Sequence, residues 1–184
     1  MSKRMSVFVL FALCALLALT WTTNYNPVAA APQQAAGAPA AKLTPAQGYD
    51  VHVLAPHLVN GKIMGPYHHY CKVYTPDPKI VCLIYESTEP NAVMTQVEYF
   101  VAKTVSRPNV PLAAWNKYYH DHAEEIATGR VQVLDVSPEE AKKIAAAAAQ
   151  TDGIIFHLWW PMNAKAPNGE VKHPQSVGHK PRTK

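Results

Sequence analysis

The sequence lacks the short motifs of several common function classes. It contains no glycine-rich phosphate loop, no serine nucleophile elbow and no C-x-x-C pair. These absences argue against nucleotide binding, the α/β-hydrolase fold and thioredoxin chemistry. Charged residues make up only 16% of the chain, and its net charge is +4. Because nucleic-acid binding depends on a strong positive field, we expect neither a nucleic acid nor a nucleotide as a partner.

A long apolar run is present only near the N-terminus. Lys3 and Arg4 precede an uninterrupted apolar stretch at residues 7–19, which is shorter than the roughly 20 residues that a membrane-spanning helix needs. Val28 and Ala30 are small residues at the spacing that a signal peptidase prefers. This pattern predicts a signal peptide over residues 1–30 and export to the periplasm or the extracellular space, with an uncleaved membrane anchor as the alternative.

Composition divides the remainder of the chain. Residues 31–48 are nearly all Ala, Pro, Gln and Gly, so they contain too little apolar bulk to offset the entropy of ordering them, and we expect a linker. Residues 49–166 have the mixed composition of a single folded domain. Residues 167–184 are rich in Pro, Gly, Lys and His, and we expect a disordered tail.

Hydrophobic periodicity predicts an α+β domain with a mostly antiparallel sheet and two main helices. The first helix is expected over residues 88–107, where apolar residues recur on one side. The second begins at Ser137, which forms a capping box with Glu140 behind Pro138, and it ends before Gly153. Alternating or β-branched runs predict strands in "DVHVLAPHLV", "HHYCKVY", "KIVCLIYES", "RVQVLDV" and "GIIFHLWW".

Cysteine is scarce, and its placement suggests a cross-link. Cys14 lies in the predicted signal peptide, which leaves Cys71 and Cys82 at similar distances from the turn "TPDPK". An antiparallel hairpin would place these two side chains opposite each other. The sequence therefore allows either a disulfide in an oxidising compartment or two buried free thiols.

Histidines and acids form the main candidate site. His69 shares a strand face with Cys71, whereas His68 points to the other face. His120 and His122 form an H-x-H pair followed by Glu125, and two such imidazoles with a carboxylate are a ligand set for zinc or iron. If this segment is helical, a salt-bridged surface turn between His120 and Glu124 is the alternative.

Two further polar residues lie among apolar neighbours. Glu98 is at the edge of the apolar stripe of the first predicted helix, and His157 alternates with Ile155 and Trp159 on the last strand. A buried carboxylate is unfavourable unless it is paired. Either residue is a satisfied core group, or both converge with the other histidines on one polar pocket. The sequence leaves the reaction and the substrate of such a pocket open.

Several motifs together resemble the oil-body-associated protein family. The matching segments are "HHYC", "CLIYES", "VEY", "HDHAEEIATG" and "FHLWW", between residues 50 and 161. The resemblance implies a lipid-surface or structural role, and it brings no established activity or cofactor. It also implies that recurring polar positions of the family fall on His69, Cys71, Cys82, Glu98, His122, Glu125 and His157. The chain departs from the family in its predicted signal peptide and in an extra "NKYY" after Trp115.

Three functions follow from these observations. The first is a lipid-surface or structural protein, which the resemblance implies. The second is a metal-binding protein or a metal-dependent enzyme that uses the histidines and acids. The third is a secreted binding module that a disulfide stabilises and whose polar residues form a core network.

Overall fold

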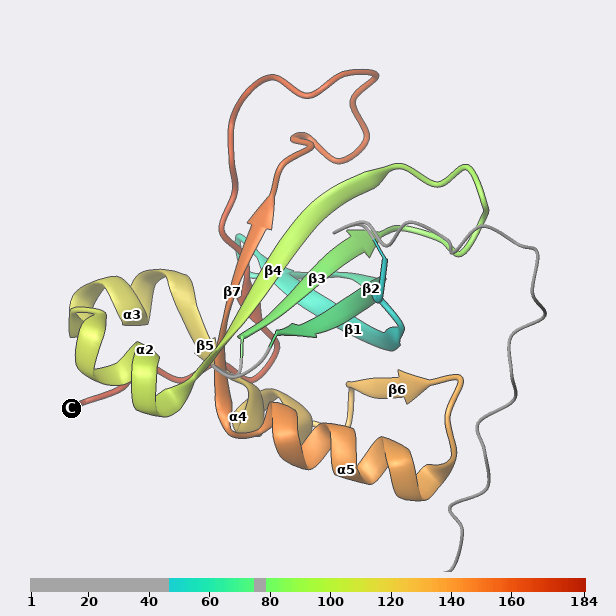
Figure 1. Cartoon of the computed structure of the whole chain (residues 1–184). Helices are drawn as coiled ribbons and strands as arrows, with labels where there is room; N and C mark the ends of the chain where they lie inside the picture. Colours follow the sequence, from blue (N-terminus) through green and yellow to red (C-terminus); the bar gives the residue numbers. More distant parts are fainter. Residues whose placement is uncertain (1–46, 75–78) are drawn as a thin grey trace, which may run out of the picture. The chain divides into compact units, whose positions relative to one another are not determined.

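The computed structural model describes residues 47–74 and 79–184, and its centre is one strongly curled, antiparallel sheet of eight strands (Figure 1). The strand order is β5-β7-β4-β3-β2-β1-β6, and β8 pairs with β1. The strands are β1 (Val51–Val59), β2 (Lys62–Tyr74), β3 (Lys79–Tyr85), β4 (Met94–Ala102), β5 (Tyr119–Asp121), β6 (Gln132–Leu134), β7 (Thr151–His157) and β8 (Gln175–Ser176). The predicted signal peptide and nearly all of the predicted linker lie outside the described residues.

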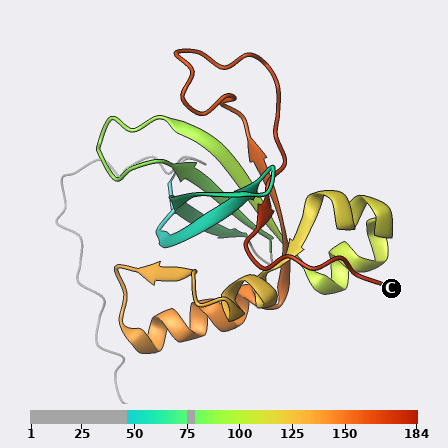
Figure 2. The same cartoon turned by 180° about the vertical axis from the view of Figure 1, so that it is seen from behind.

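Within the described residues, four helices flank this sheet. Two short helices, α2 (Lys103–Asn109) and α3 (Leu112–Tyr118), lie together on one side, and α4 (His122–Ala127) and α5 (Pro138–Ala148) lie beneath the sheet beside β6 (Figure 2). The α+β class and the antiparallel sheet are therefore confirmed, with more helices than the two that we expected. None of the described helices is long and apolar enough to cross a membrane.

The start of α5 was predicted correctly. The Ser137 hydroxyl accepts a hydrogen bond from the backbone N–H of Glu140, and Pro138 occupies the first turn. Helix α5 ends at Ala148, before Gly153 as expected, and Gly153 itself lies inside β7.

The first predicted helix is wrong over its middle part, because Met94–Ala102 form strand β4, and within the predicted range only residues 103–107 are helical, in α2. The valines Val97 and Val101 are four residues apart, which fits a helix, but the same spacing also fits a strand with a period of two. In the structure β4 lies between β3 and β7. Its polar and aromatic residues Gln96, Glu98 and Phe100 are buried on one face. The inner face of this strand thus delivers a carboxylate to the centre of the domain.

The β2–β3 hairpin decides between the two alternatives for the cysteines, a disulfide and two free thiols, in favour of the disulfide. Cys71 lies directly opposite Cys82 in the ladder, and the two residues form a disulfide. Both are buried in the core cluster with Tyr67, Ile84 and Phe100. A structural disulfide favours an oxidising compartment, which agrees with the expectation of export.

The predicted disordered tail needs correction. Within residues 167–184, β8 pairs with β1, so that Ser176 lies opposite His57 and is fully buried. Farther along, the backbone of Arg182 makes two hydrogen bonds to the side chain of Asn116 in α3. The segment cannot build a core of its own, but its backbone groups pair with elements that are already folded. Composition alone does not reveal such pairing.

Candidate metal centre

Three buried side chains from separate elements meet inside the curled sheet. Glu98 comes from β4, His120 from β5 and His122 from the first position of α4. Oxygen Oε1 of Glu98 lies 3.1 Å from Nε2 of His120 and 3.2 Å from Nε2 of His122. The three groups can each offer one ligand atom to the same metal ion, because these atoms all lie within 4.8 Å of one another.

Gly153 keeps the space at this cluster open. It lies opposite Phe100 of β4 and opposite His120 of β5, at the point where β7 joins the two strands. A Cβ atom at this position would lie 2.4 Å from Nε2 of His120 and 2.6 Å from Oε1 of Glu98. Such distances are far below van der Waals contact, so only glycine leaves these polar atoms accessible to each other and to an ion.

Thr151 fixes the proton position of His122. The Thr151 hydroxyl donates to the carbonyl oxygen of Ala148 at 2.7 Å, so its oxygen is an acceptor for the ring of His122. Nδ1 of His122 lies 2.8 Å from this oxygen and 3.2 Å from the Thr151 carbonyl oxygen, and it therefore carries the proton. In the neutral ring, the lone pair of Nε2 then points at the Glu98 carboxylate. This contact is favourable only when a proton or a metal ion lies between the two atoms.

The two buried carboxyl groups of the centre differ in their pKa. Burial alone would raise the pKa of Glu98, but its contacts with His120 and His122 outweigh burial and hold that pKa well below its usual value. Burial raises the pKa of Glu125 to about 7, with a smaller opposing effect of His120. Glu98 is thus an anion, while Glu125 can gain or lose a proton near neutral pH.

A chain of three histidines lies beside the centre. Nδ1 of His69 donates to the carbonyl oxygen of Tyr67 at 3.0 Å, which leaves Nε2 of His69 as the acceptor for Nε2 of His57 at 3.1 Å. Nδ1 of His57 in turn accepts from Nε2 of His157 at 3.0 Å. Burial lowers the pKa of all three rings, that of His157 to about 4. These rings are neutral, and His69 reaches Glu98 only at 3.6 Å.

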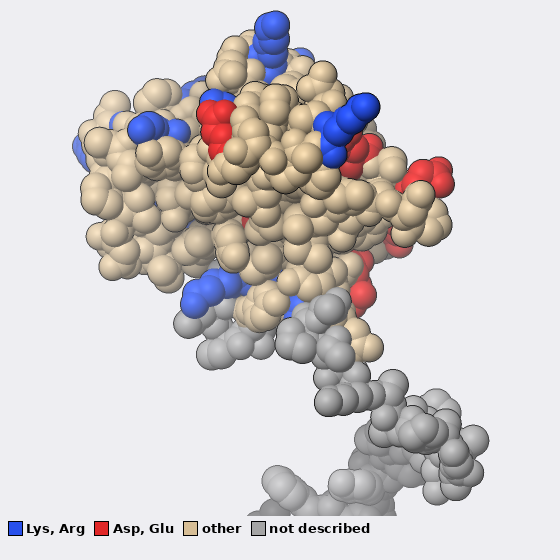
Figure 3. Space-filling view, turned by 90° about the horizontal axis from the view of Figure 1, so that it is seen from above, with Lys and Arg blue, Asp and Glu red and all other residues tan. Residues whose placement is uncertain are grey.

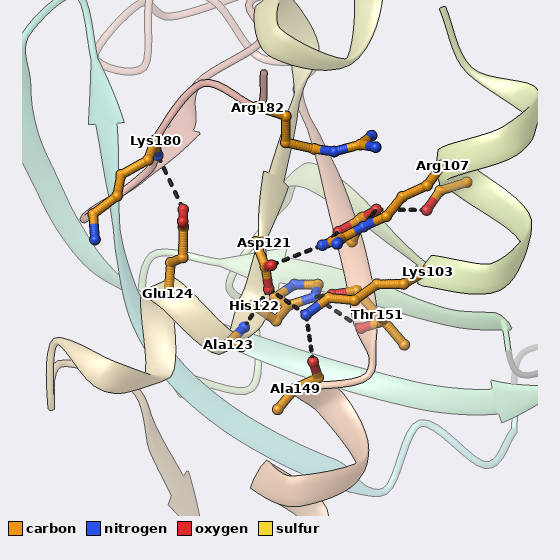
Figure 4. A network of polar contacts seen from close by, with 12 residues as sticks. Lys103, Arg107, Asp121, His122, Ala123, Glu124, Ala149, Thr151, Lys180 and Arg182 are labelled. Atoms are coloured by element: carbon orange, nitrogen blue, oxygen red, sulfur yellow. Dashed lines mark hydrogen bonds and ion pairs between the residues drawn. The ribbon is translucent and has the colours of Figure 1, made fainter. Parts of the chain in front are cut away.

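Charged side chains from α2 hold the segment that carries both candidate histidine ligands (Figure 4). Asp121, between them in the sequence, accepts a hydrogen bond from the backbone N–H of Ala123 at 2.7 Å and caps α4. Arg107 and Lys103 both form ion pairs with Asp121. The alternative of a salt-bridged helical surface turn is therefore wrong, because His120 is fully buried in a strand.

The predicted site residues fall into two groups. Glu98, His120 and His122 meet directly, with Glu125 at 3.8 Å from His120 and His69 at 3.6 Å from Glu98. His157 lies apart from them and connects only through His57 and His69. Sequence reasoning missed three residues: His57, Thr151 and Gly153. Of these, only His57 had a signal, since it alternates with Ala55 and Val59 in the first predicted strand.

Comparison with known proteins places the chain in a family but brings no activity. The family model described as "Protein of unknown function (DUF1264)" matches residues 43–180. No curated protein and no solved structure matches the chain. The link with oil bodies therefore stays a prediction, because this match does not include it. The matched range covers three quarters of the sequence and every described strand and helix, and the chain belongs to the DUF1264 family.

Proposed function

We propose that this domain binds one divalent transition metal ion, zinc or iron, through Glu98, His120 and His122. The observation that carries the proposal is the contact between the His122 lone pair and the Glu98 carboxylate, which Thr151 enforces. Two electron-rich atoms aimed at each other in a buried site need a proton or a metal ion between them, and of these we propose the metal ion.

His120 supports the same conclusion. Its ring is fully buried, and neither ring nitrogen makes a well-aligned hydrogen bond to any described residue. Buried polar atoms of native proteins are almost always hydrogen-bonded, and Nε2 of His120 has only the poorly aligned contact with Glu98 at 3.1 Å, so a metal ion would be a better partner for it. A metal ion would satisfy Nε2 of His120 and of His122 together with one oxygen of Glu98.

The two distances from Glu98 fit a shared ion, while the three ligand atoms together lie within 4.8 Å of one another. Ligand atoms about 2.1 Å from zinc are about 3.0 Å apart at a right angle and about 3.4 Å apart at a tetrahedral angle. The observed separations from Glu98 Oε1 are 3.1 Å and 3.2 Å. The bond from His122 Nδ1 to Thr151 is also the outer-shell contact that ligating histidines usually make.

The donor set favours chemistry over a purely structural site. Two histidines and one carboxylate leave a coordination position open, as in catalytic zinc sites and non-haem iron sites. A metal ion held there would lower the pKa of a bound water. Glu125 lies next to His120 and can give or take a proton near neutral pH. We therefore propose a metal-dependent enzyme as the more specific form of this function.

Metal content tests the proposal directly. Protein purified without a His-tag is expected to hold about one equivalent of metal by elemental mass spectrometry. His122→Ala and Glu98→Gln should lose it, because each removes one of three ligands. His68→Gln is the matched control, since that ring bonds to His52 and not to the centre. A folded wild-type protein that holds no metal, even after incubation with zinc, iron(II), manganese and copper, would contradict the proposal.

Gly153→Ala gives a second test that removes no ligand. The added methyl group would occupy the space beside His120 and Glu98, so we expect metal affinity to fall by at least about tenfold, as it does when outer-shell contacts are lost. Metal titration of the apo protein measures the affinity, and far-UV circular dichroism reports whether the variant is folded. Wild-type affinity in a folded Gly153→Ala protein would show that the ion binds elsewhere.

A further inference from the structure

A cavity lies between the inner face of the sheet and the layer that α4, α5 and β6 form. Its volume is about 120 Å³, and fourteen of its eighteen lining residues are apolar. Helix α5 contributes the small residues Ala145 and Ala148 to its wall, so the helix leaves space that larger side chains would fill. An apolar cavity of about 150 Å³ can hold a benzene molecule, and this one is of similar size.

The polar lining is confined to the candidate metal centre. The four polar residues are His69, Glu98, His122 and Glu125. One face of the cavity therefore offers acceptor and ligand atoms, and the rest offers hydrocarbon. A molecule that fits this distribution has an apolar body and a single polar group.

Glu125 lacks a hydrogen-bond donor. The residue is buried at 6% exposure, and its nearest basic contact is Nε2 of His120 at 3.8 Å, beyond hydrogen-bonding distance. No hydrogen bond between the described residues ends on its carboxyl oxygens, and its side chain keeps 8% exposure. A buried carboxyl group without a donor is unfavourable, so a donor group on a molecule in the cavity would stabilise it.

We propose that this cavity binds a small organic molecule with an apolar body and one hydroxyl group, about the size of phenol, whose hydroxyl donates to Glu125. The apolar body packs against the β1 and β2 side chains and the alanines of α5. Binding itself needs no metal ion. A role of this molecule as a substrate rests on the proposed function, because its hydroxyl would lie beside Glu98 and His122, which are the proposed metal ligands.

Isothermal titration calorimetry with phenol tests the proposal on metal-free and metal-loaded protein. We expect binding in the millimolar range or tighter to both forms, as small ligands of this size allow. Ala148→Leu should weaken binding by about tenfold or more, because its added carbons fill the cavity. Ala146→Leu, on the exposed side of the same helix, is the matched control and should change affinity by less than about twofold.

Two further probes examine the hydroxyl group and the shape of the body. Toluene has the same body without the hydroxyl, and we expect it to bind about tenfold more weakly, as expected for one lost buried hydrogen bond. Glu125→Met should remove this difference, because methionine keeps the length but offers no comparable acceptor. 1-Hexanol has an aliphatic body in place of the aromatic ring of phenol. Whichever of these two hydroxyl compounds binds more tightly shows whether the cavity prefers aliphatic or aromatic molecules.

Three outcomes would overturn the proposal. The first is the absence of binding of both phenol and 1-hexanol at about 10 mM, about ten times a dissociation constant of about 1 mM. The second outcome is an unchanged phenol affinity in both Ala148→Leu and Ala145→Leu. If Ala148→Leu fails to fold, Ala145→Leu alone serves for this comparison. The third is equal affinity for toluene and phenol. Because metal-free protein is included, loss of metal binding alone leaves this test intact.

Discussion

The rings of His122 and His69 are oriented in the same way, by a hydrogen bond from Nδ1. In each ring Nδ1 donates to a fixed oxygen, of Thr151 or of Tyr67, and Nε2 is turned towards the middle of the domain. The outcome differs, because Nε2 of His69 already accepts from His57 whereas Nε2 of His122 faces the Glu98 carboxylate. At the level of single residues, this difference separates a supporting histidine from a metal ligand.

The low pKa of His157 predicts an acid-sensitive core. Its pKa is about 4 in the folded protein against an ordinary value of 6.5. Between these values the unfolded chain binds a proton that the folded chain does not, so the free energy of unfolding falls as the pH drops from about 6.5 to about 4. The full effect of this ring is about 3 kcal/mol. Urea denaturation at several pH values measures it.

A variant of His157 separates its contribution to the pH dependence of stability from that of groups with the opposite effect. Glu125, whose pKa is raised to about 7, has the opposite effect: its contribution to the free energy of unfolding is lost as the pH rises from 4.5 to 7. His157→Gln keeps a hydrogen-bonding group but cannot become charged, so its stability should fall less than that of the wild type on acidification. His173→Gln, outside the histidine chain, should behave like the wild type. Equal pH dependence of His157→Gln and wild-type protein would refute a neutral buried His157.

Single residues could be predicted where their type contrasts with their neighbours. Glu98 and His157 stood out because each lies among apolar residues, and the H-x-H pair stood out by spacing. Thr151 and Gly153 carried no such contrast, because their roles depend on the register of β7 with β4 and β5. Strand register is set by contacts distant in sequence, and these are invisible in a local pattern.

At the scale of elements, the hairpin and the last helix were predictable and β4 was not. The β2–β3 register follows from two alternating runs around one turn, and α5 follows from its cap at Ser137. Strand β4 is paired on both edges and has helix-compatible spacing on its outer face, so tertiary pairing overrides the local helical pattern. This misassignment placed Glu98 on a helix, although the residue itself was recognised as a candidate.

The disulfide should stabilise the β2–β3 hairpin mainly by restricting the unfolded chain. Cys71 and Cys82 are 11 residues apart in the sequence. Closing a loop of that length lowers the entropy of the unfolded chain, which adds about 3 kcal/mol to the free energy of unfolding at room temperature. The double variant Cys71→Ala/Cys82→Ala is expected to lose about this free energy of unfolding in urea denaturation. Thiol titration of the denatured wild type should find neither cysteine free.

The metal centre provides the control for this variant. Neither cysteine belongs to the three candidate ligands, so metal content should be unchanged in the double alanine protein while it remains folded. A stability equal to that of the wild type would mean that the unfolded chain is restricted by other contacts. Two free thiols in the wild type would contradict the disulfide itself.

At the scale of the whole domain, the curled sheet carries the site and loops form the opposite end. The candidate centre and the cavity lie towards α4 and α5, whereas the long β3–β4 loop and the segment after β7 extend at the other end (Figures 1 and 2). Seen from that end, the surface has wide uncharged areas between scattered charges (Figure 3). The exposed apolar residues Val93, Leu158 and Val171 belong to these loops.

The lipid-surface role that the resemblance implies makes a prediction about these loops. Protein lacking residues 1–30 should float with triacylglycerol droplets coated with phosphatidylcholine, and the truncation is needed because an apolar run such as residues 7–19 binds lipid by itself. If this role holds, Val93→Glu and Leu158→Glu, at 57% and 40% exposure, should reduce flotation because each places a charge on an apolar part of these loops. Val136→Glu, at 43% exposure but next to α5, is the control. Because the loops and the metal centre lie at different ends, absence of flotation in a protein that still binds metal would exclude the lipid role and leave the metal centre as the function of the domain.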